Sequence, residues 1–279
     1  MIKIRIKKIF MRGFTLIELL IVIAVLGVLA GGVIVAINPT AKINAANMAK
    51  AETFSASVQN NLAMDLVGEW TFNENTVNDT SGYGNITTNH GADCTNALDR
   101  KGQKKACSFN GSNYIDAGNA ENLTLTTKAT IEAWVYKRSS GATGSWPNIV
   151  GKNQFRIYNN PPNASDMNAY VVINGVGHWP QFSTNFPLNQ WHHLVVTFNG
   201  DLASQNIKLY YDGGLVTIQD APGTLSSGTE DVIIGGYWGG TSFDGLVDDV
   251  RIYKSALLSY QIKQLYAQGL ARHLLAFKY

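Results

Sequence analysis

A run of 24 residues, from Phe14 to Ile37, contains a single charged side chain, that of Glu18. As an α-helix this run would extend roughly 36 Å, more than the ~30 Å hydrocarbon core of a bilayer. The residues before it carry only positive charges, on Lys3, Arg5, Lys7, Lys8 and Arg12. Because basic residues stay on the cytoplasmic side of a membrane segment, the pattern predicts a membrane-inserted helix with a cytoplasmic N-terminus.

Three interpretations of the apolar run are open: a plain membrane anchor, a secretory signal peptide, and a segment that is cut before its helix assembles with others. Val28-Leu29-Ala30 resembles a signal-peptide cleavage site. The run is nevertheless longer than the ~7–15 residues of a usual signal-peptide core. Glu18 favours the third interpretation, because a carboxylate in a membrane helix is costly and usually has a partner and a function.

The sequence Arg12-Gly13-Phe14-Thr15-Leu16-Ile17-Glu18-Leu19-Leu20 closely resembles the processing site of type IV pilins and pseudopilins. In that family a prepilin peptidase cuts after the glycine, and the new amine is methylated. The resemblance implies cleavage between Gly13 and Phe14, which removes a basic leader peptide, residues 1–13. It also implies that Glu18 pairs with the Phe14 amine of a neighbouring subunit and so fixes the register of bundled helices. The implied partners are other pilin-like subunits, the prepilin peptidase and the membrane.

The N-terminal helix is predicted to extend over residues 14–65, with its transmembrane part at 14–37. Asn38-Pro39 predicts a kink, because proline cannot donate a backbone hydrogen bond. An apolar stripe at helical spacing follows, made of Met48, Ala51, Phe54, Val58 and Leu62. We expect the first half of the helix to pack in the membrane or a fibre, and the second half to pack against a globular head.

From Gly68 onward the sequence changes to short alternating runs separated by Gly, Asn, Asp and Pro. This pattern predicts an all-β sandwich or barrel. Hairpin turns are predicted at Asn110-Gly111, Asn174-Gly175 and Asp212-Gly213, and a closing helix at 260–268. The predicted strands are 69–72, 106–109, 114–117, 130–137, 154–158, 169–173, 191–198, 207–211, 215–218, 231–235 and 245–253.

Six segments of this region resemble, in family order, the laminin-G-like jelly roll of the concanavalin A-like superfamily. They are residues 66–74, 79–82, 108–111, 131–135, 191–195 and 243–253. The resemblance implies a jelly-roll sandwich over 66–269, followed by a C-terminal tail, 270–279. The expected fold class is therefore a long N-terminal α-helix joined to an all-β jelly-roll sandwich. The family includes sugar binders, adhesion modules and some glycosidases, so the fold alone does not fix an activity.

The formal charge of +2 comes from the leader. Without its five basic residues, 17 Lys and Arg face 20 Asp and Glu, which leaves −3 and no sign of a nucleic-acid surface. The low charged fraction of 15%, with 27 glycines, favours an extracellular β-rich protein.

Cys94 and Cys107 have no metal-binding spacing. In an exported protein they predict one disulfide, the alternative being two buried thiols.

Catalytic patterns are weak in this sequence. Hydrolases of the superfamily often carry Glu-x-Asp-x-Glu on one strand, and this triplet does not occur here. The adjacent pairs Asp248-Asp249 and His192-His193 should point to opposite faces of their strands, so neither pair can act together. Glu132 stands between apolar residues. We expect the chain not to be an enzyme.

A structural calcium ion is a further expectation. Residues 79–85 form an oxygen-rich turn, and alternation predicts that Asp248 faces inward with Leu246, Val250 and Ile252. Laminin-G-like domains often hold one calcium ion, so the resemblance implies ligands from Asp79, from backbone carbonyls near Gly82 and from Asp248. In the alternative, Asp79 caps its own turn and Asp248 accepts hydrogen bonds from backbone or Arg groups.

Three tryptophans, Trp146, Trp179 and Trp238, occur in loops rich in Gly or Pro. If exposed, their rings could stack on sugars; in the alternative, the loops bury them.

The sequence as a whole leaves two function classes open. The first is a bacterial pilus or pseudopilus subunit at the cell surface whose head binds extracellular glycans or partner proteins. The second is a single-pass, membrane-anchored carbohydrate-active or structural surface protein that does not assemble into a filament. The Gly13–Glu18 motif favours the first.

Overall fold

The computed structural model describes residues 39–99, 102–103, 105–139, 146–160, 166–182, 186–226, 228–236 and 243–271. Gly13, Phe14, Glu18 and the apolar run Phe14–Ile37 lie outside these residues, and so does Trp238. The chain divides into two compact units, Met1–Gln59 and Asn60–Tyr279. Helix α2, Pro39–Asp65, agrees with the end of the predicted N-terminal helix. None of the described helices combines the length and the apolar character needed to cross a membrane.

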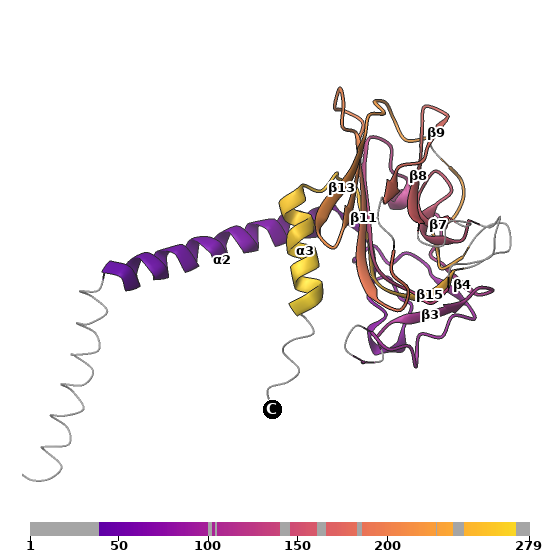
Figure 1. Ribbon diagram of the computed structural model, residues 1–279, viewed down its shortest axis with the longest axis horizontal. Coiled ribbons are helices and arrows are strands. Elements are labelled where there is room, and N and C mark those ends of the chain that lie inside the picture. The colour runs from indigo at the N-terminus through magenta and orange to yellow at the C-terminus, as the bar shows by residue number, and fades with distance from the viewer. Residues whose placement is uncertain are drawn as a thin grey trace, which may run out of the picture. The chain divides into compact units, whose positions relative to one another are not determined.

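Two antiparallel sheets pack face to face in the second unit (Figure 1). Within the described residues the first sheet has seven strands, in the order β1-β15-β5-β11-β12-β13, with β3 paired to β15. Its long central strands are connected by antiparallel pairing of β15 with β5 and of β5 with β11. The strands are β1 (Leu66–Trp70), β3 (Cys107–Asn110), β5 (Lys128–Lys137), β11 (Trp191–Asn199), β12 (Ile207–Tyr211), β13 (Gly214–Gln219) and β15 (Asp244–Tyr253).

The second sheet has eight strands within the described residues, in the order β10-β8-β7-β6-β14-β4-β2, with β9 paired to β8. Two short 3-10 turns, η1 (Asn73–Asn75) and η2 (Glu121–Leu123), lie in the connections. The strands are β2 (Thr88–His90), β4 (Tyr114–Asp116), β6 (Asn148–Lys152), β7 (Phe155–Asn160), β8 (Asp166–Ile173), β9 (Val176–His178), β10 (Gln181–Phe182) and β14 (Ile233–Ile234).

The hydrophobic core lies between the inner faces of the two sheets. Successive strand residues point to opposite faces of a sheet, so the side chain of every second residue can enter this layer. Ile131, Ala133 and Val135 of β5 enter it from the first sheet, and Met167 and Ala169 of β8 from the second. Burial of each large apolar side chain contributes about 1.5–3 kcal/mol before the entropy cost of ordering the chain. The sandwich is therefore held chiefly by apolar packing.

Cys94 and Cys107 form a disulfide, with Cα atoms 4.1 Å apart. Both residues are buried in the core, and the bond ties the connection after β2 to the first residue of β3. This is the predicted pairing.

The outer face of the first sheet is covered by helix α3, Ser259–Ala271, near the predicted closing helix. Ile262 and Leu265 of α3 are buried. Tyr266 stacks on Trp134 of β5 with ring centroids 5.5 Å apart. Gly269 lies so close to the same indole that an added Cβ would approach its nitrogen to 2.5 Å. Aromatic stacking and a close helix approach therefore fix α3 to the sheet.

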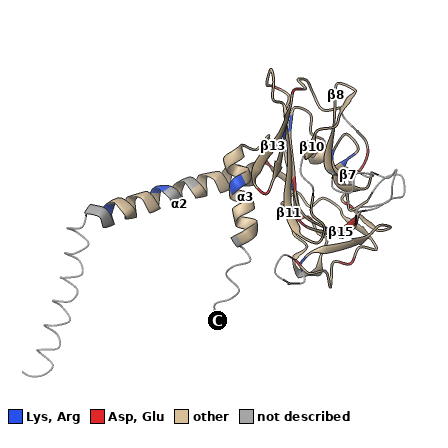
Figure 2. Ribbon diagram, in the orientation of Figure 1, with Lys and Arg blue, Asp and Glu red and all other residues tan. Residues whose placement is uncertain are grey.

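A cluster of charges lies on the outer face of the first sheet, although charged residues are sparse along both sheets (Figure 2). Arg251 of β15 contacts three carboxylates: Glu69 at 2.7 Å, Glu132 at 2.9 Å and Asp249 at 3.2 Å. Glu132 has no exposed surface and also contacts His193 at 3.2 Å. We refer to these five residues as the Arg251 cluster.

Two of the predicted hairpin turns are confirmed, and one is wrong. Asn174-Gly175 joins β8 to β9, and Asp212-Gly213 joins β12 to β13. All four residues have positive φ, as the two-residue turn of a twisted hairpin requires. Asn110-Gly111 instead carries the chain from the first sheet to the second, because β3 pairs with β15 and β4 with β14 and β2.

For the first half of β15, the prediction of which side chains face the core is wrong. Val247, Val250 and Ile252 belong to the core, whereas Leu246 does not. The register against β5 shifts between Asp248 and Arg251, and Asp249 adopts a positive φ of 46°. A bulge inserts one extra residue and resets the alternation. Simple alternation across Asp248 therefore fails, and Asp248 and Asp249, predicted to point to opposite faces, line one hollow.

Candidate functional site

A groove of about 570 Å³ opens on the outer face of the second sheet. Its walls come from the segments around β6 to β10. We call it the aromatic groove, and it is lined by Trp146, Asn153, Arg156, Tyr158, Asn168, Tyr170, Trp179 and Gln181.

Strand alternation places four of these side chains together. Phe155 and Ile157 of β7 enter the core, so the residue that follows each of them faces the groove. The same rule applies to β8. The register of β7 against β8 then sets Arg156 opposite Tyr170, and Tyr158 opposite Asn168. The floor of the aromatic groove is thus fixed by the pairing of two central strands.

Exposed indole rings form part of the wall. The residue Trp146 is 49% exposed and Trp179 is 58% exposed, an unusual state for so large an apolar side chain. The Trp179 ring lies 5.4 Å from the Tyr170 ring, at 34° between planes. Gly177 lies beneath both rings, and an added Cβ there would approach each of them to 2.9 Å. The structure thus brings two of the three predicted loop tryptophans into one groove.

Polar groups complete the floor. The Arg156 guanidinium lies 4.9 Å from the Tyr170 ring centre and 5.6 Å from that of Tyr158, and it donates to Asn153 Oδ1 at 2.7 Å. Asn168 is 1% exposed, and its Nδ2 donates to the Tyr158 hydroxyl at 3.5 Å. The Oδ1 of Asn168 accepts no hydrogen bond from the described residues. Burial raises the pKa of Tyr158, although Asn168 and Arg156 act against this, so the phenol stays neutral.

Sequence reasoning missed these floor residues. The only available signal was the alternation within 154–158 and 169–173, which assigns Arg156, Tyr158 and Tyr170 to one face of each strand. Their common location depends on the pairing of β7 with β8, which no local pattern reports.

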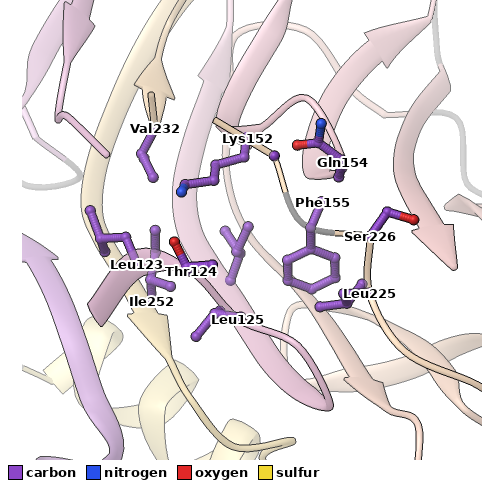
Figure 3. A pocket seen from close by; sticks show the side chains of 12 residues that line it. Leu123, Thr124, Leu125, Lys152, Gln154, Phe155, Leu225, Ser226, Val232 and Ile252 are labelled. Atoms are coloured by element: carbon purple, nitrogen blue, oxygen red, sulfur yellow. The ribbon is translucent and has the colours of Figure 1, made fainter. Parts of the chain in front are cut away.

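A second cavity, of about 30 Å³, lies inside the sandwich (Figure 3). Apolar side chains such as Phe155 and Leu225 line it, and the Lys152 side chain extends into it. Burial lowers the pKa of the Lys152 ammonium, with Asp231 and Glu230 acting in the opposite direction. Its Nζ also contacts the Asn119 side-chain oxygen. The cavity has the volume of about one water molecule, so it cannot hold a sugar.

A third hollow, of about 360 Å³, contains two carboxylates, those of Asp116 and Asp231. Burial and the neighbouring Asp116 raise the pKa of Asp231, while Lys152 lowers it. The sequence search for paired acids considered one strand at a time. It could not find this pair, because its members are more than one hundred residues apart and meet only through the pairing of β4 with β14.

Asp79 is held by its own turn. Its Oδ1 accepts hydrogen bonds from the backbone N–H groups of Glu69 and Ser81, both at 2.9 Å. Its Oδ2 accepts from the Ser81 hydroxyl and from the backbone and side chain of Asn85. Five donors thus occupy the lone pairs that a cation would need, and Asp79 does not fit the role of a calcium ligand.

Asp248 lines a fourth hollow, of about 320 Å³. Asp79 and Gly82, the other two predicted calcium ligands, do not line this hollow. The neighbouring Asp249 donates its backbone N–H to Asp248 Oδ1 at 2.7 Å. Among the described residues, no group of three or more His, Cys, Asp or Glu side chains could hold a metal ion. Calcium binding itself stays a prediction. The hollow is lined by Thr71, Asn73, Asp99, Gln103, Lys105, Asp248 and Asp249.

The two adjacent histidines have separate surroundings, as the strand geometry predicts. His192 contacts Asp212 at 2.9 Å and the Tyr211 hydroxyl at 2.6 Å, and its ring stacks on Tyr211. His193 contacts Glu132. They do not form a chelating pair.

The two packed sheets, their antiparallel order and the groove on one outer face define a lectin-like jelly roll. The sequence profile of the concanavalin A-like lectin/glucanases superfamily matches residues 109–263, more than half of the chain. The chain belongs to this superfamily. The profile of the prokaryotic N-terminal methylation motif matches residues 11–34, which include Gly13, Phe14 and Glu18. Both resemblances seen in the sequence are therefore confirmed.

Two of the similar solved structures come from toxins. The binding domain of Paraclostridial Mosquitocidal Protein 1 has a TM-score of 0.61 and 17% identity, over 74% of this chain and 52% of that one. A structure of botulinum neurotoxin type C has a TM-score of 0.60 and 15% identity, over 76% and 53%. This chain therefore spans about half the length of these toxin structures.

Domain 4 of AbnA, a GH43 extracellular arabinanase from Geobacillus stearothermophilus, was solved in complex with arabinotriose. It has a TM-score of 0.58 and 19% identity, over 72% of this chain and 98% of that one. At these identities the similarity shows the fold alone. No curated protein sequence matches the chain.

Proposed function

We propose that this chain is a pilin-like surface subunit of a bacterial type IV pilus or pseudopilus, and that its jelly-roll head is a non-catalytic module that binds extracellular glycans through the aromatic groove. The observation that carries the proposal is the groove wall. Two half-exposed indoles, Trp146 and Trp179, flank buried polar side chains, including an Asn168 oxygen with no partner among the described residues. A sugar presents an apolar ring face to the indoles and hydroxyl groups to such amides.

The comparisons support this proposal in two ways. Domain 4 of AbnA, with the same fold, was solved with arabinotriose, and the description of the botulinum neurotoxin type C structure names interaction with two ganglioside molecules. The methylation motif supports display on the cell surface or in a pilus. Many heads on one filament would raise avidity even if each site were weak.

The test is a glycan screen with the full chain, purified in a detergent that has no sugar headgroup. We expect Trp179→Ala to weaken binding of any captured glycan by roughly tenfold or more, because exposed aromatic anchors carry much of the energy of a binding site. Tyr83→Ala is the matched control. Tyr83 is a 52% exposed aromatic residue that does not line the aromatic groove, and this variant should bind like the wild type.

The same sugars should be assayed for hydrolysis. A glycosidase needs two carboxyls across a cleft, and the pair beside the third hollow is the one to examine. Turnover that disappears in Asp116→Asn or Asp231→Asn would replace the proposal with an enzymatic function. Binding that is unaffected by Trp179→Ala and Trp146→Ala would refute the assignment of the site. The absence of binding to any glycan would favour a structural role or a protein contact.

A further inference from the structure

We infer that the aromatic groove selects a sugar that carries a carboxylate, with Arg156 as the residue that recognises the anion. This inference rests on the proposed function and names its ligand class. Among the described residues that line the groove, Arg156 has the only formal charge, and the others are aromatic or amide side chains. The site is therefore electrostatically complementary to an anion.

The position of Arg156 is fixed before any ligand arrives. The residue is 8% exposed, its guanidinium lies against the rings of Tyr158 and Tyr170, and Asn153 accepts a hydrogen bond from Nη1. Both aromatic faces favour the cation. A guanidinium held in place can direct a charge-assisted hydrogen bond at a carboxylate, with a fixed geometry that a flexible lysine does not provide.

The acidic residue nearest to this part of the groove does not add negative charge to its lining. Glu230 accepts hydrogen bonds from Gln154 Nε2 and from the Asn153 side chain, and it does not line the groove. On the ligand side, Trp179 and Tyr170 provide the stacking surface beside the guanidinium. A sugar ring on the indole would thus place an acidic substituent near Arg156 and its hydroxyl groups near Asn168 and Gln181.

The first test changes the ligand and leaves the protein intact. Oligogalacturonate is compared with its methyl ester, and sialyllactose with lactose, by titration of the detergent-solubilised full chain. Each pair keeps the sugar framework and changes the anion. We expect the acidic member of at least one pair to bind roughly tenfold or more tightly, as a charged hydrogen bond predicts. This preference should shrink when the salt concentration is raised.

The second test uses Arg156→Gln and Arg156→Lys. Arg156→Gln should abolish the preference, so that the acidic sugar and its neutral partner bind this variant with the same affinity. Arg156→Lys should recover only part of the preference, since it keeps the charge but loses the planar fork. Melting curves show whether either variant is folded. If one is not, the ligand pairs and the salt dependence still decide.

The outcomes separate the two proposals. If acidic and neutral sugars bind equally and both depend on Trp179, the inference is overturned and the proposed function stands. If no saccharide binds, or if Trp179→Ala has no effect, the proposed function fails and the inference fails with it. An acidic preference that survives in a folded Arg156→Gln variant would also overturn the assignment to Arg156.

Discussion

The Arg251 cluster should be the most sensitive charged site for stability in the sandwich. Arg251 is 9% exposed and contacts the carboxylates of Glu69, Glu132 and Asp249. Arg251→Met would remove the cation and leave three carboxylates close together, Glu132 without any exposed surface. Removing one member of a buried ion pair costs about 3–5 kcal/mol. For a domain of this size the loss corresponds to a fall of roughly 6–20 °C in melting temperature.

Glu132→Gln provides the matched comparison. It keeps the shape of the side chain, and Arg251 retains two carboxylates, at 2.7 and 3.2 Å. The cost should therefore be only about 1–3 kcal/mol, the loss of charged hydrogen bonds. Arg251→Met should be the more destabilising of the two by about 2 kcal/mol.

The pH dependence gives an independent check. Burial by itself would raise the pKa of Glu132, but the hydrogen bond from His193 and the charge of Arg251 outweigh it and lower the pKa below its ordinary value of 4.5. A lowered folded-state pKa contributes stability that is present above pH 4.5 and is lost as the pH falls through the folded value. The difference in stability between wild type and Glu132→Gln should therefore shrink below pH 4.5.

Urea unfolding of the detergent-solubilised full chain is followed by tryptophan fluorescence at pH 7 and at several values below 4.5. It measures the destabilisation by Arg251→Met, the destabilisation by Glu132→Gln, and the change of the latter with pH. The reasoning is refuted if Arg251→Met unfolds within about 1 kcal/mol of the wild type, or if Glu132→Gln costs as much as Arg251→Met.

The remaining predictions concern other parts of the chain. Mass spectrometry of the protein from cells should show a mature N-terminus at methylated Phe14, and an intact leader would contradict this processing. Glu18→Val should leave the head folded but reduce incorporation into filaments, and a normal filament yield would contradict the role of Glu18. Alkylation of the exported chain, unfolded in urea without reductant, should label neither Cys94 nor Cys107, whereas two labelled thiols would disprove the bond outside the cell. Loss of the disulfide should cost ~3 kcal/mol in urea unfolding. Asp79→Ala should lower the melting temperature equally in calcium and in EDTA, because five hydrogen-bond donors hold that carboxylate; an effect seen only in calcium would make it a ligand. The calcium ion is tested in the same curves, since an ion that binds only the folded chain should make the wild type melt lower in EDTA.

Most of the sandwich could be predicted because alternation and turn residues are local signals. Every predicted strand has a counterpart, and Ile207–Tyr211 agrees at both ends. The strands that were missed are short, as for β9 and β10, or lack alternation. In β6, for example, all five residues are buried, and Gly151 has a φ of 132°. A strand of this kind gives no period-two pattern to detect.

The candidate site was only partly predictable for a related reason. Aromatic residues in Gly- or Pro-rich loops are visible in the sequence, so Trp146 and Trp179 could be proposed together with Trp238, although their exposure could not be known. Arg156 could not be, because its role depends on the register that sets it opposite Tyr170. The face of Asp248 was predicted wrongly for a third reason: a bulge at Asp249 changes the alternation, and a bulge has no clear sequence signal when the residue with positive φ is not glycine.

A crystal structure of the chain with a bound oligosaccharide would test the glycan-binding head most directly. We expect a sugar ring to pack on Trp179 and Tyr170 in the aromatic groove, with polar contacts to Asn168 and Arg156. A saccharide bound in another place, such as the hollow beside Asp116 and Asp231, would contradict the assignment of the groove as the binding site.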